Sequence, residues 1–230
     1  MAHKIIVTGA NGGLGTFVTQ KLLNEGYEVH GTIIPGGPDP EEVKSTFKNN
    51  EQLFLKAVDA LNPVEPAEYI RQIGEVYGAV LTVGGFQMKP FLKTTDDDLD
   101  KMINLNFKTA FYFAKPLAEQ LKAQKQGHIF FIGSKPALEK GGKALTSYSI
   151  SKHMLIKLSE IVNEEFKGTH ASSVVIAPDM IDTLPNREAM PDANFNEWIK
   201  PVEIADAIIF YLSDEAKRIR EPILKLYGNY

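Results

Sequence analysis

Seven short apolar runs, rich in β-branched residues, alternate along this chain with longer stretches of helical periodicity. Each run is bounded by Gly, Pro or polar residues, as buried strands usually are. The expected strands are KIIVTGA at 4–10, YEVHGTII at 27–34, LFLKAV at 53–58, GAVLTV at 78–83, HIFFIG at 128–133, SSVVIA at 172–177 and ILKLY at 223–227. The expected helices lie near 14–25, 40–49, 65–76, 95–124, 147–167 and 201–215. The alternation predicts an α/β fold in which a doubly wound parallel sheet of about seven strands is flanked by helices.

The composition limits the class of partner. The 230 residues are 43% hydrophobic and 23% charged, which predicts a single globular domain over 1–230. A net charge of −4 gives no long-range attraction to nucleic acid or anionic lipid, and no apolar run reaches the roughly 18 residues of a membrane span. The N-terminus shows no export signal and the chain has no cysteine, so we expect a cytoplasmic protein that binds small molecules.

The turn after the first expected strand is rich in glycine. The stretch VTGANGGLG follows that strand and opens the first expected helix. Gly9 permits the tight turn, Gly13 lets the backbone approach a pyrophosphate, and Gly15 lets the helix pack closely on the sheet. Free N–H groups and the dipole at the helix start favour an anion. The context predicts a Rossmann-type dinucleotide site, and the alternative is a structural turn without a ligand. The residues of this predicted site are Gly9, Asn11, Gly12, Gly13, Leu14 and Gly15.

A tyrosine and a lysine stand four residues apart in TSYSISK, at Tyr148 and Lys152. Positions i and i+4 lie on one face of a helix, so the phenol and the ammonium would be neighbours. The spacing alone is a weak signal, because short motifs of this kind also occur by chance. Its significance depends on motifs elsewhere in the chain.

Several motifs occur in the order seen in the short-chain dehydrogenase/reductase family, which the sequence resembles over essentially its whole length. The glycine spacing, with Gly9 followed by Gly13 and Gly15, is closer to this family than to the GxGxxG of larger dehydrogenases. FFIGSK places Ser134 at the end of the fifth strand, and the Tyr148 motif follows 14 residues later, about the separation found in the family.

The resemblance implies further cofactor contacts. AVDAL puts Asp59 where the family contacts the adenine, although a solvated acid at a strand end explains Asp59 equally well. TVGG stands where the family usually has Asn-Ala-Gly. Gly84 and Gly85 would still let the backbone approach the cofactor closely, but the Asn is missing. In VVIAPDMIDT, Pro178 lies at the turn and Thr183 stands where the family holds the nicotinamide carboxamide.

The resemblance also implies a chemical role for each of four residues. A carbonyl that accepts hydride becomes an alkoxide, so the site must supply a proton and stabilise negative charge. Tyr148 would be the acid/base, and Lys152 would lower the pKa of the phenol and hold the nicotinamide ribose. Ser134 would donate a hydrogen bond to the substrate oxygen. INLNFKTAF puts Asn106 at the position of the family's active-site asparagine, which holds a water and kinks its helix.

The end of the second expected strand bears on the choice of cofactor. An acid there binds the ribose 2′-OH of NAD, and a basic residue accommodates the NADP phosphate. GTIIPGG places Ile33 at this position, so no carboxylate is present to repel a phosphate. We expect NADP or NAD, with a slight preference for NADP.

The segment LPNREAMPDANFNEW, near 184–200, is expected to cover the substrate. Together with VGGF and GSKPAL it resembles the dihydropteridine reductase branch of the family, which reduces a quinonoid pterin. Two departures count against that branch, namely a serine at Ser134 and the missing acid at Ile33. We therefore expect a small carbonyl or alcohol substrate, with pterin reduction as the alternative. A nucleotide-binding sensor without turnover is the third possibility, and the retained tyrosine and lysine argue against it.

Two further expectations concern assembly and metals. The helix from Leu99 to Leu121 carries more apolar residues than one sheet face requires, so we expect a homodimer or homotetramer through the helices near 95–124 and 147–167. The five histidines lack the spacing of a metal site, so none is expected. The acids Asp96, Asp97 and Asp98 follow two threonines at a helix start, where capping and the helix dipole explain them.

Overall fold

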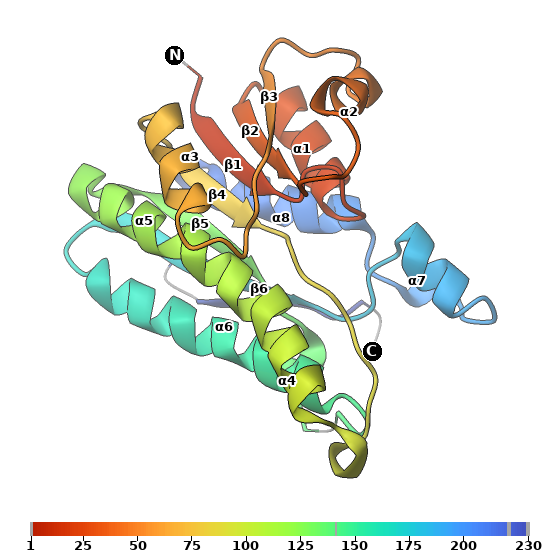
Figure 1. The fold of residues 1–230 in the computed structure, drawn as a ribbon. Helices are drawn as coiled ribbons and strands as arrows, with labels where there is room; N and C mark the ends of the chain where they lie inside the picture. The colour runs from red at the N-terminus through yellow and green to blue at the C-terminus, as the bar shows by residue number, and fades with distance from the viewer. Residues whose placement is uncertain (1, 141, 220–221, 229–230) are drawn as a thin grey trace.

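The computed structural model describes residues 2–140, 142–219 and 222–228. Its centre is a sheet of seven parallel strands in the order β3-β2-β1-β4-β5-β6-β7 (Figure 1). The strands are β1 Lys4–Thr8, β2 Glu28–Ile33, β3 Leu53–Ala57, β4 Gly78–Leu81, β5 Gln126–Ile132, β6 His170–Pro178 and β7 Ile223–Leu226. The chain runs outward from β1 in one direction and returns to continue from β4 in the other. The predicted doubly wound parallel sheet is therefore confirmed, and its switch point lies between β1 and β4.

Helices cover both faces of the sheet. The α-helices are α1 Gly15–Asn24, α2 Pro40–Thr46, α3 Glu65–Ile73, α4 Asp96–Met102, α5 Thr109–Gln124, α6 Thr146–Glu165, α7 Leu184–Ala189 and α8 Pro201–Leu212. Short 3-10 turns are η1 Phe91–Lys93, η3 Lys135–Ala137, η4 Phe195–Glu197 and η5 Asp214–Ala216. No helix in the described part of the chain is long and apolar enough to cross a bilayer.

The strand residues alternate between two separate cores. On one face, Ile5 and Val7 of β1 pack with apolar residues of α1, α2 and α8. On the other face, Ile6 of the same strand packs with α3, α5 and α6. β5 does the same, with Phe130 in the first core and Phe131 in the second. Because both faces are covered, the strands appear in the sequence as continuous apolar runs rather than as polar and apolar alternation.

The helix expected over 95–124 is divided by η2, a π-helical segment at Ile103–Lys108, in which the backbone N–H of Thr109 bonds to the carbonyl of Asn104. The segment contains Asn106, the residue at which the family resemblance implies a kinked helix. Single π turns of this kind are frequent at functional sites. The segment near 184–200, which the sequence predicts only as a cover, contains α7 and η4. Figure 1 shows α7 projecting from the body of the molecule.

The start of α4 is capped as its sequence predicts. The Thr95 hydroxyl accepts from the Asp98 backbone, and the Asp98 side chain accepts from the Thr95 backbone. Asp96 and Asp97 occupy the first turn, where the helix dipole favours negative charge.

Candidate active site

The sequence-predicted residues gather at the carboxyl ends of the strands. The glycine-rich turn follows β1, Gly84 and Gly85 follow β4, Ser134 follows β5, and Pro178 is the last residue of β6. The strands are parallel, so these ends share one edge of the sheet. Ligands of doubly wound folds bind at this edge, next to the switch point.

The glycine-rich turn leaves its backbone open on one side. Gly9 has a φ of +63°, and a Cβ on Gly15 would lie only 2.0 Å from the Gly9 carbonyl oxygen, so α1 packs directly onto the turn. Gly12 and Gly13 are exposed, and a Cβ on Gly13 would lie 3.2 Å from Cγ2 of Thr183. The segment after β6 therefore reaches across to the turn.

No side chain caps the start of α1, and its first turn has no acid. Asn11 is half-buried in the turn, and Leu14 is buried against the first core. An uncapped helix start behind an exposed glycine backbone fits the pyrophosphate of a dinucleotide.

Lys152 is buried in the second turn of α6. It is 6% exposed, and its Nζ donates to the Ile132 carbonyl at 2.8 Å. A Cβ on Gly84 would lie 3.1 Å from the same Nζ, so the glycine makes room for the amine. Burial lowers the pKa of Lys152 to about 8. The amine therefore lies where β4 and β5 end, and burial disfavours its charged form.

Tyr148 lies one turn earlier on α6, beside Ser134. Burial raises the pKa of the Tyr148 phenol, and the nearby Ser134 hydroxyl opposes this by lowering it. The two hydroxyls do not, however, meet the geometry of a hydrogen bond, and Ser134 Oγ has no partner in the described part of the chain. Because Ser134 is only 4% exposed, an unpaired hydroxyl there costs on the order of 1–3 kcal/mol. A substrate oxygen would satisfy it.

Asn106 ties the loop after β4 to α6. The residue is fully buried in the π-helical segment, and its Oδ1 accepts from the Gly85 N–H at 2.8 Å. Its Nδ2 donates to the Gly85 carbonyl at 3.1 Å and to Ser151 Oγ at 3.0 Å. The Ser151 hydroxyl in turn donates to the Tyr148 carbonyl at 2.8 Å. The side-chain amide is thus fully engaged in holding the site together.

Two further residues predicted from the sequence are Asp59 and Pro178. Asp59 is exposed in the loop after β3, and its Oδ1 accepts from the Leu61 N–H at 2.9 Å, which explains its presence as a turn residue. Pro178 is buried, and the following Asp179 forms an ion pair with Lys135, with Nζ and Oδ2 2.6 Å apart. This pair stands next to Ser134 and was not anticipated from the sequence.

A polar clamp on the loop after β4 was also missed. The nearly buried Asp98 carboxylate accepts from Gln87 Nε2 at 2.6 Å, from the Thr95 N–H at 2.9 Å and from the Lys89 ammonium. The Lys89 ammonium holds the pKa of Asp98 well below its usual range. Ser147, the residue before the tyrosine, donates to Gln87 Oε1 at 3.1 Å. The threonine and aspartate spacing indicated the cap, but no sequence signal indicated Gln87.

The segment near 184–200 is a flap pinned at its base. The Asp182 N–H bonds to the Ile199 carbonyl at 2.8 Å, and the Ile199 N–H bonds to the Met180 carbonyl at 2.8 Å. Within the flap, Arg187 Nη2 donates to Asp182 Oδ2 at 2.7 Å, and the guanidinium lies 4.7 Å from the Phe195 ring centre. The flap is therefore held together by contacts of its own, and Thr183 is the residue just before it.

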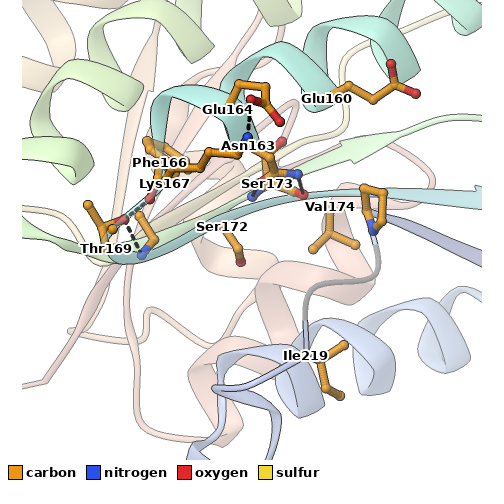
Figure 2. A pocket seen from close by; sticks show the side chains of 13 residues that line it. Glu160, Asn163, Glu164, Phe166, Lys167, Thr169, Ser172, Ser173, Val174 and Ile219 are labelled. Atoms are coloured by element: carbon orange, nitrogen blue, oxygen red, sulfur yellow. Dashed lines mark hydrogen bonds and ion pairs between the residues drawn. The ribbon is translucent and has the colours of Figure 1, made fainter.

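A groove of about 420 Å³ lies at the other end of the sheet and contains none of the predicted site residues (Figure 2). It is bordered by the end of α6, the start of β6 and the residues Ile219 and Pro222. Asn163 Nδ2 donates to the Ser173 carbonyl at 2.8 Å, and Asn163 Oδ1 accepts from the Ser173 N–H at 2.8 Å. These polar groups of Asn163 and Ser173 therefore satisfy each other. Among the described residues, no three His, Asp or Glu side chains gather as metal ligands.

Comparison with known proteins gives consistent matches. The profile of the short chain dehydrogenase family matches residues 3–194. An acetoacetyl-CoA reductase from Synechocystis sp. is 30% identical, over 97% of this chain and 94% of that protein. The solved structure of ElxO with NADP bound has a TM-score of 0.89 at 20% identity, covering 98% of this chain and 97% of the other. A Serratia marcescens short-chain dehydrogenase/reductase has a TM-score of 0.86 at 22% identity, covering 98% and 96%. At these identities the two structures demonstrate the fold alone.

Proposed function

The chain belongs to the short-chain dehydrogenase/reductase family of NAD(P)-dependent oxidoreductases, and on that premise we propose that it moves hydride between the nicotinamide and a small carbonyl or alcohol. The observation that supports the proposal is the position of Tyr148 beside Ser134, whose buried hydroxyl has no hydrogen-bond partner in the described chain. Tyr148 can donate a proton and Ser134 can donate a hydrogen bond at the same place. Both are needed by a carbonyl oxygen that becomes an alkoxide when the carbonyl carbon accepts hydride.

Each residue has a role that its surroundings support. Ser134 donates a hydrogen bond to the carbonyl oxygen, and Tyr148 gives its phenolic proton to that oxygen as negative charge develops. A nicotinamide dinucleotide, when bound, would supply or accept the hydride. Lys152, when charged, favours the phenolate, and its bond to the Ile132 carbonyl fixes the ammonium. Asn106 positions the loop after β4 and the first turns of α6 relative to each other.

The cofactor we propose is NADP(H) in preference to NAD(H). Ile33, the last residue of β2, is buried and carries no charge, so the end of β2 lacks the carboxylate that would repel a 2′-phosphate. The structural neighbour ElxO was solved with NADP bound, which agrees with this preference. Gly9, Gly12, Gly13 and Gly15 would cradle the pyrophosphate, and Thr183 would lie near the nicotinamide.

The substrate class we propose is a ketone or aldehyde, or the matching alcohol. The hydrogen-bond donor at Ser134 suits a carbonyl oxygen, and the relative from Synechocystis sp. is named as a reductase of a ketoacyl compound. The quinonoid pterin, suggested by the likeness to the dihydropteridine reductase branch, ranks second. A nucleotide-binding sensor ranks third, because the tyrosine and the lysine are both retained.

We further propose a homodimer or homotetramer that forms through α5 and α6. On α6, an apolar stripe is formed by Ile150, Met154, Leu158 and Ile161, of which Leu158 also packs against the second core. Ile150 and Ile161 are exposed, and Met154 and Leu158 are half-buried. On α5 and its π-helical segment, Phe107 and Phe111 stack with ring centres 5.8 Å apart and are only half-buried. Apolar surface of this extent on adjacent helices suits a second copy of the chain.

The proposal is tested by following NADPH and NADH oxidation against a panel of ketones, aldehydes and quinonoid pterin. We expect reduction of carbonyl compounds with NADPH favoured. We expect Tyr148→Phe to lower kcat by about 10²–10⁴ while cofactor affinity stays unchanged, because only the proton donor is lost. Undiminished turnover in Tyr148→Phe would end the assignment. Dinucleotide binding without consumption of any substrate would favour the sensor.

A further inference from the structure

Phe86, in the loop after β4, has an unusual position for a large apolar side chain. Its ring lies 4.9 Å from the Tyr148 ring, centre to centre, at an angle of 70°. The edge-to-face contact is of the kind that stabilises aromatic pairs. The side chain is nevertheless 57% exposed, so most of its surface remains free beside the phenol.

The loop holds Phe86 in this position from both sides. On the amino-terminal side, both backbone polar groups of Gly85 bond to the buried amide of Asn106. On the carboxyl-terminal side, the Gln87 side chain is held by the Asp98 carboxylate and by a serine in the first turn of α6. These anchors fix the backbone on either side of the ring.

A single exposed apolar residue needs no explanation in itself. Other apolar residues that follow in the chain are more exposed than Phe86, among them Phe91 in η1 at 74%. Phe86 differs because it contacts the proposed acid/base residue and because both of its neighbours are anchored. A ring that is already ordered loses little entropy when a ligand packs on it.

We propose that Phe86 is a specificity-determining residue that packs against an aromatic or other flat apolar group next to the substrate's carbonyl carbon. The inference rests on the proposed function, because it locates this group from the oxygen that Tyr148 protonates. It narrows the substrate class to carbonyl compounds with a planar apolar substituent. The sequence indicated both a carbonyl substrate and a planar pterin. A carbonyl compound with a planar substituent agrees with both, since it is planar like a pterin and has an oxygen that can accept a hydrogen bond from Ser134.

The test compares kcat/KM for benzaldehyde and propanal in the wild type, Phe86→Ala, Phe86→Leu and Phe91→Ala. We expect the benzaldehyde-to-propanal ratio to fall at least about tenfold in Phe86→Ala, mainly through KM for benzaldehyde, because an aromatic packing surface is lost. Phe86→Leu, which keeps an apolar side chain, should fall between Phe86→Ala and the wild type. Phe91→Ala removes an equal ring from the same loop and should leave the ratio unchanged.

An unchanged benzaldehyde-to-propanal ratio in Phe86→Ala would overturn the inference. If that unchanged ratio comes with an equal loss of kcat/KM for both aldehydes and a shifted pH profile, Phe86 only shields the phenol from water. Thermal melting of each variant checks that the fold is retained.

Binding of benzamide in the presence of NADP, measured by calorimetry, separates this inference from the proposed reaction. Benzamide carries an aromatic ring and a carbonyl but is not readily reduced. Weaker binding in Phe86→Ala supports the role of Phe86 even where the wild type reduces no aldehyde, in which case the proposed reaction fails alone. Equal binding in both proteins, or no binding to the wild type, would count against Phe86 whatever the turnover.

Discussion

Lys152 is costly for stability, and the role proposed for it in the reaction gives a reason for its presence. Its ammonium is buried and donates a hydrogen bond to the Ile132 carbonyl, and burial lowers its pKa to about 8. A functional lysine with a lowered pKa is often retained at the expense of stability. The same burial explains Gly84, whose missing side chain leaves the space that the amine occupies.

We predict that Lys152→Met unfolds at a higher urea concentration at pH 7 while losing activity. The drop in pKa from 10.5 to about 8 sets a ceiling of roughly 3 kcal/mol on the gain. The bond to the carbonyl offsets about 1 kcal/mol or more of this, so we expect a gain of about 1–2 kcal/mol.

The pH dependence of this gain has a definite sign. Below pH 8 the folded and unfolded states both hold the proton, so the cost of burying the charge in the wild type is complete. Between about pH 8 and 10.5 the folded state loses its proton first, so the wild type becomes more stable and the advantage of the variant shrinks. Lys157→Met, on the exposed side of the same helix, should change stability by no more than about 0.5 kcal/mol. A variant less stable than the wild type at pH 7 would contradict this view of Lys152.

At the scale of secondary-structure elements, the sequence predicts the strands well and the local departures poorly. Each strand is a short apolar run with turn residues at its ends, so its position depends on nearby sequence. The π-helical segment contains a buried Asn106 whose partners, Gly85 and Ser151, lie far along the chain, and only the family resemblance indicated a kink there. Contacts of this kind appear only once the fold has formed. The clamp at Gln87 was missed for the same reason, and Phe86 attracted attention in the sequence only as part of VGGF.

We predict that Asn106→Leu, which keeps the number and branching of the side-chain heavy atoms, destabilises the protein by about 2–4 kcal/mol. It leaves both polar groups of the Gly85 backbone without their partner, at about 1–3 kcal/mol for each group that stays buried. Amide hydrogen exchange at Gly85 should accelerate more than exchange in the β5 core. Asn104→Leu, in the same π-helical segment but half-buried, serves as the control. If the Gly85 N–H is equally protected from hydrogen exchange in Asn106→Leu and the wild type, the Asn106 side chain does not hold this loop.

At the scale of the whole molecule, both sheet faces are covered by helices, and α5 and α6 retain apolar surface on their outer sides. We predict that light scattering finds two or four times the mass of the chain. Ile161→Lys places a charge on a 54% exposed position of the stripe and should reduce that mass. Phe17→Lys, on α1 at the opposite face of the sheet, should leave it unchanged. A monomeric wild type would contradict the proposed assembly but not the proposed chemistry.

The central claim is that Tyr148, Lys152 and Ser134 serve a hydride transfer at the carboxyl ends of β4 and β5. Its most direct test uses NADPH that carries deuterium at the transferable position of the nicotinamide, with benzaldehyde as acceptor and mass spectrometry of the product. The account predicts one deuterium in the benzyl alcohol made by the wild type and little or no labelled product from Tyr148→Phe, although that variant still binds NADPH. Alcohol labelled equally by the two proteins, or no labelled alcohol from the wild type with any carbonyl that it binds, would contradict it.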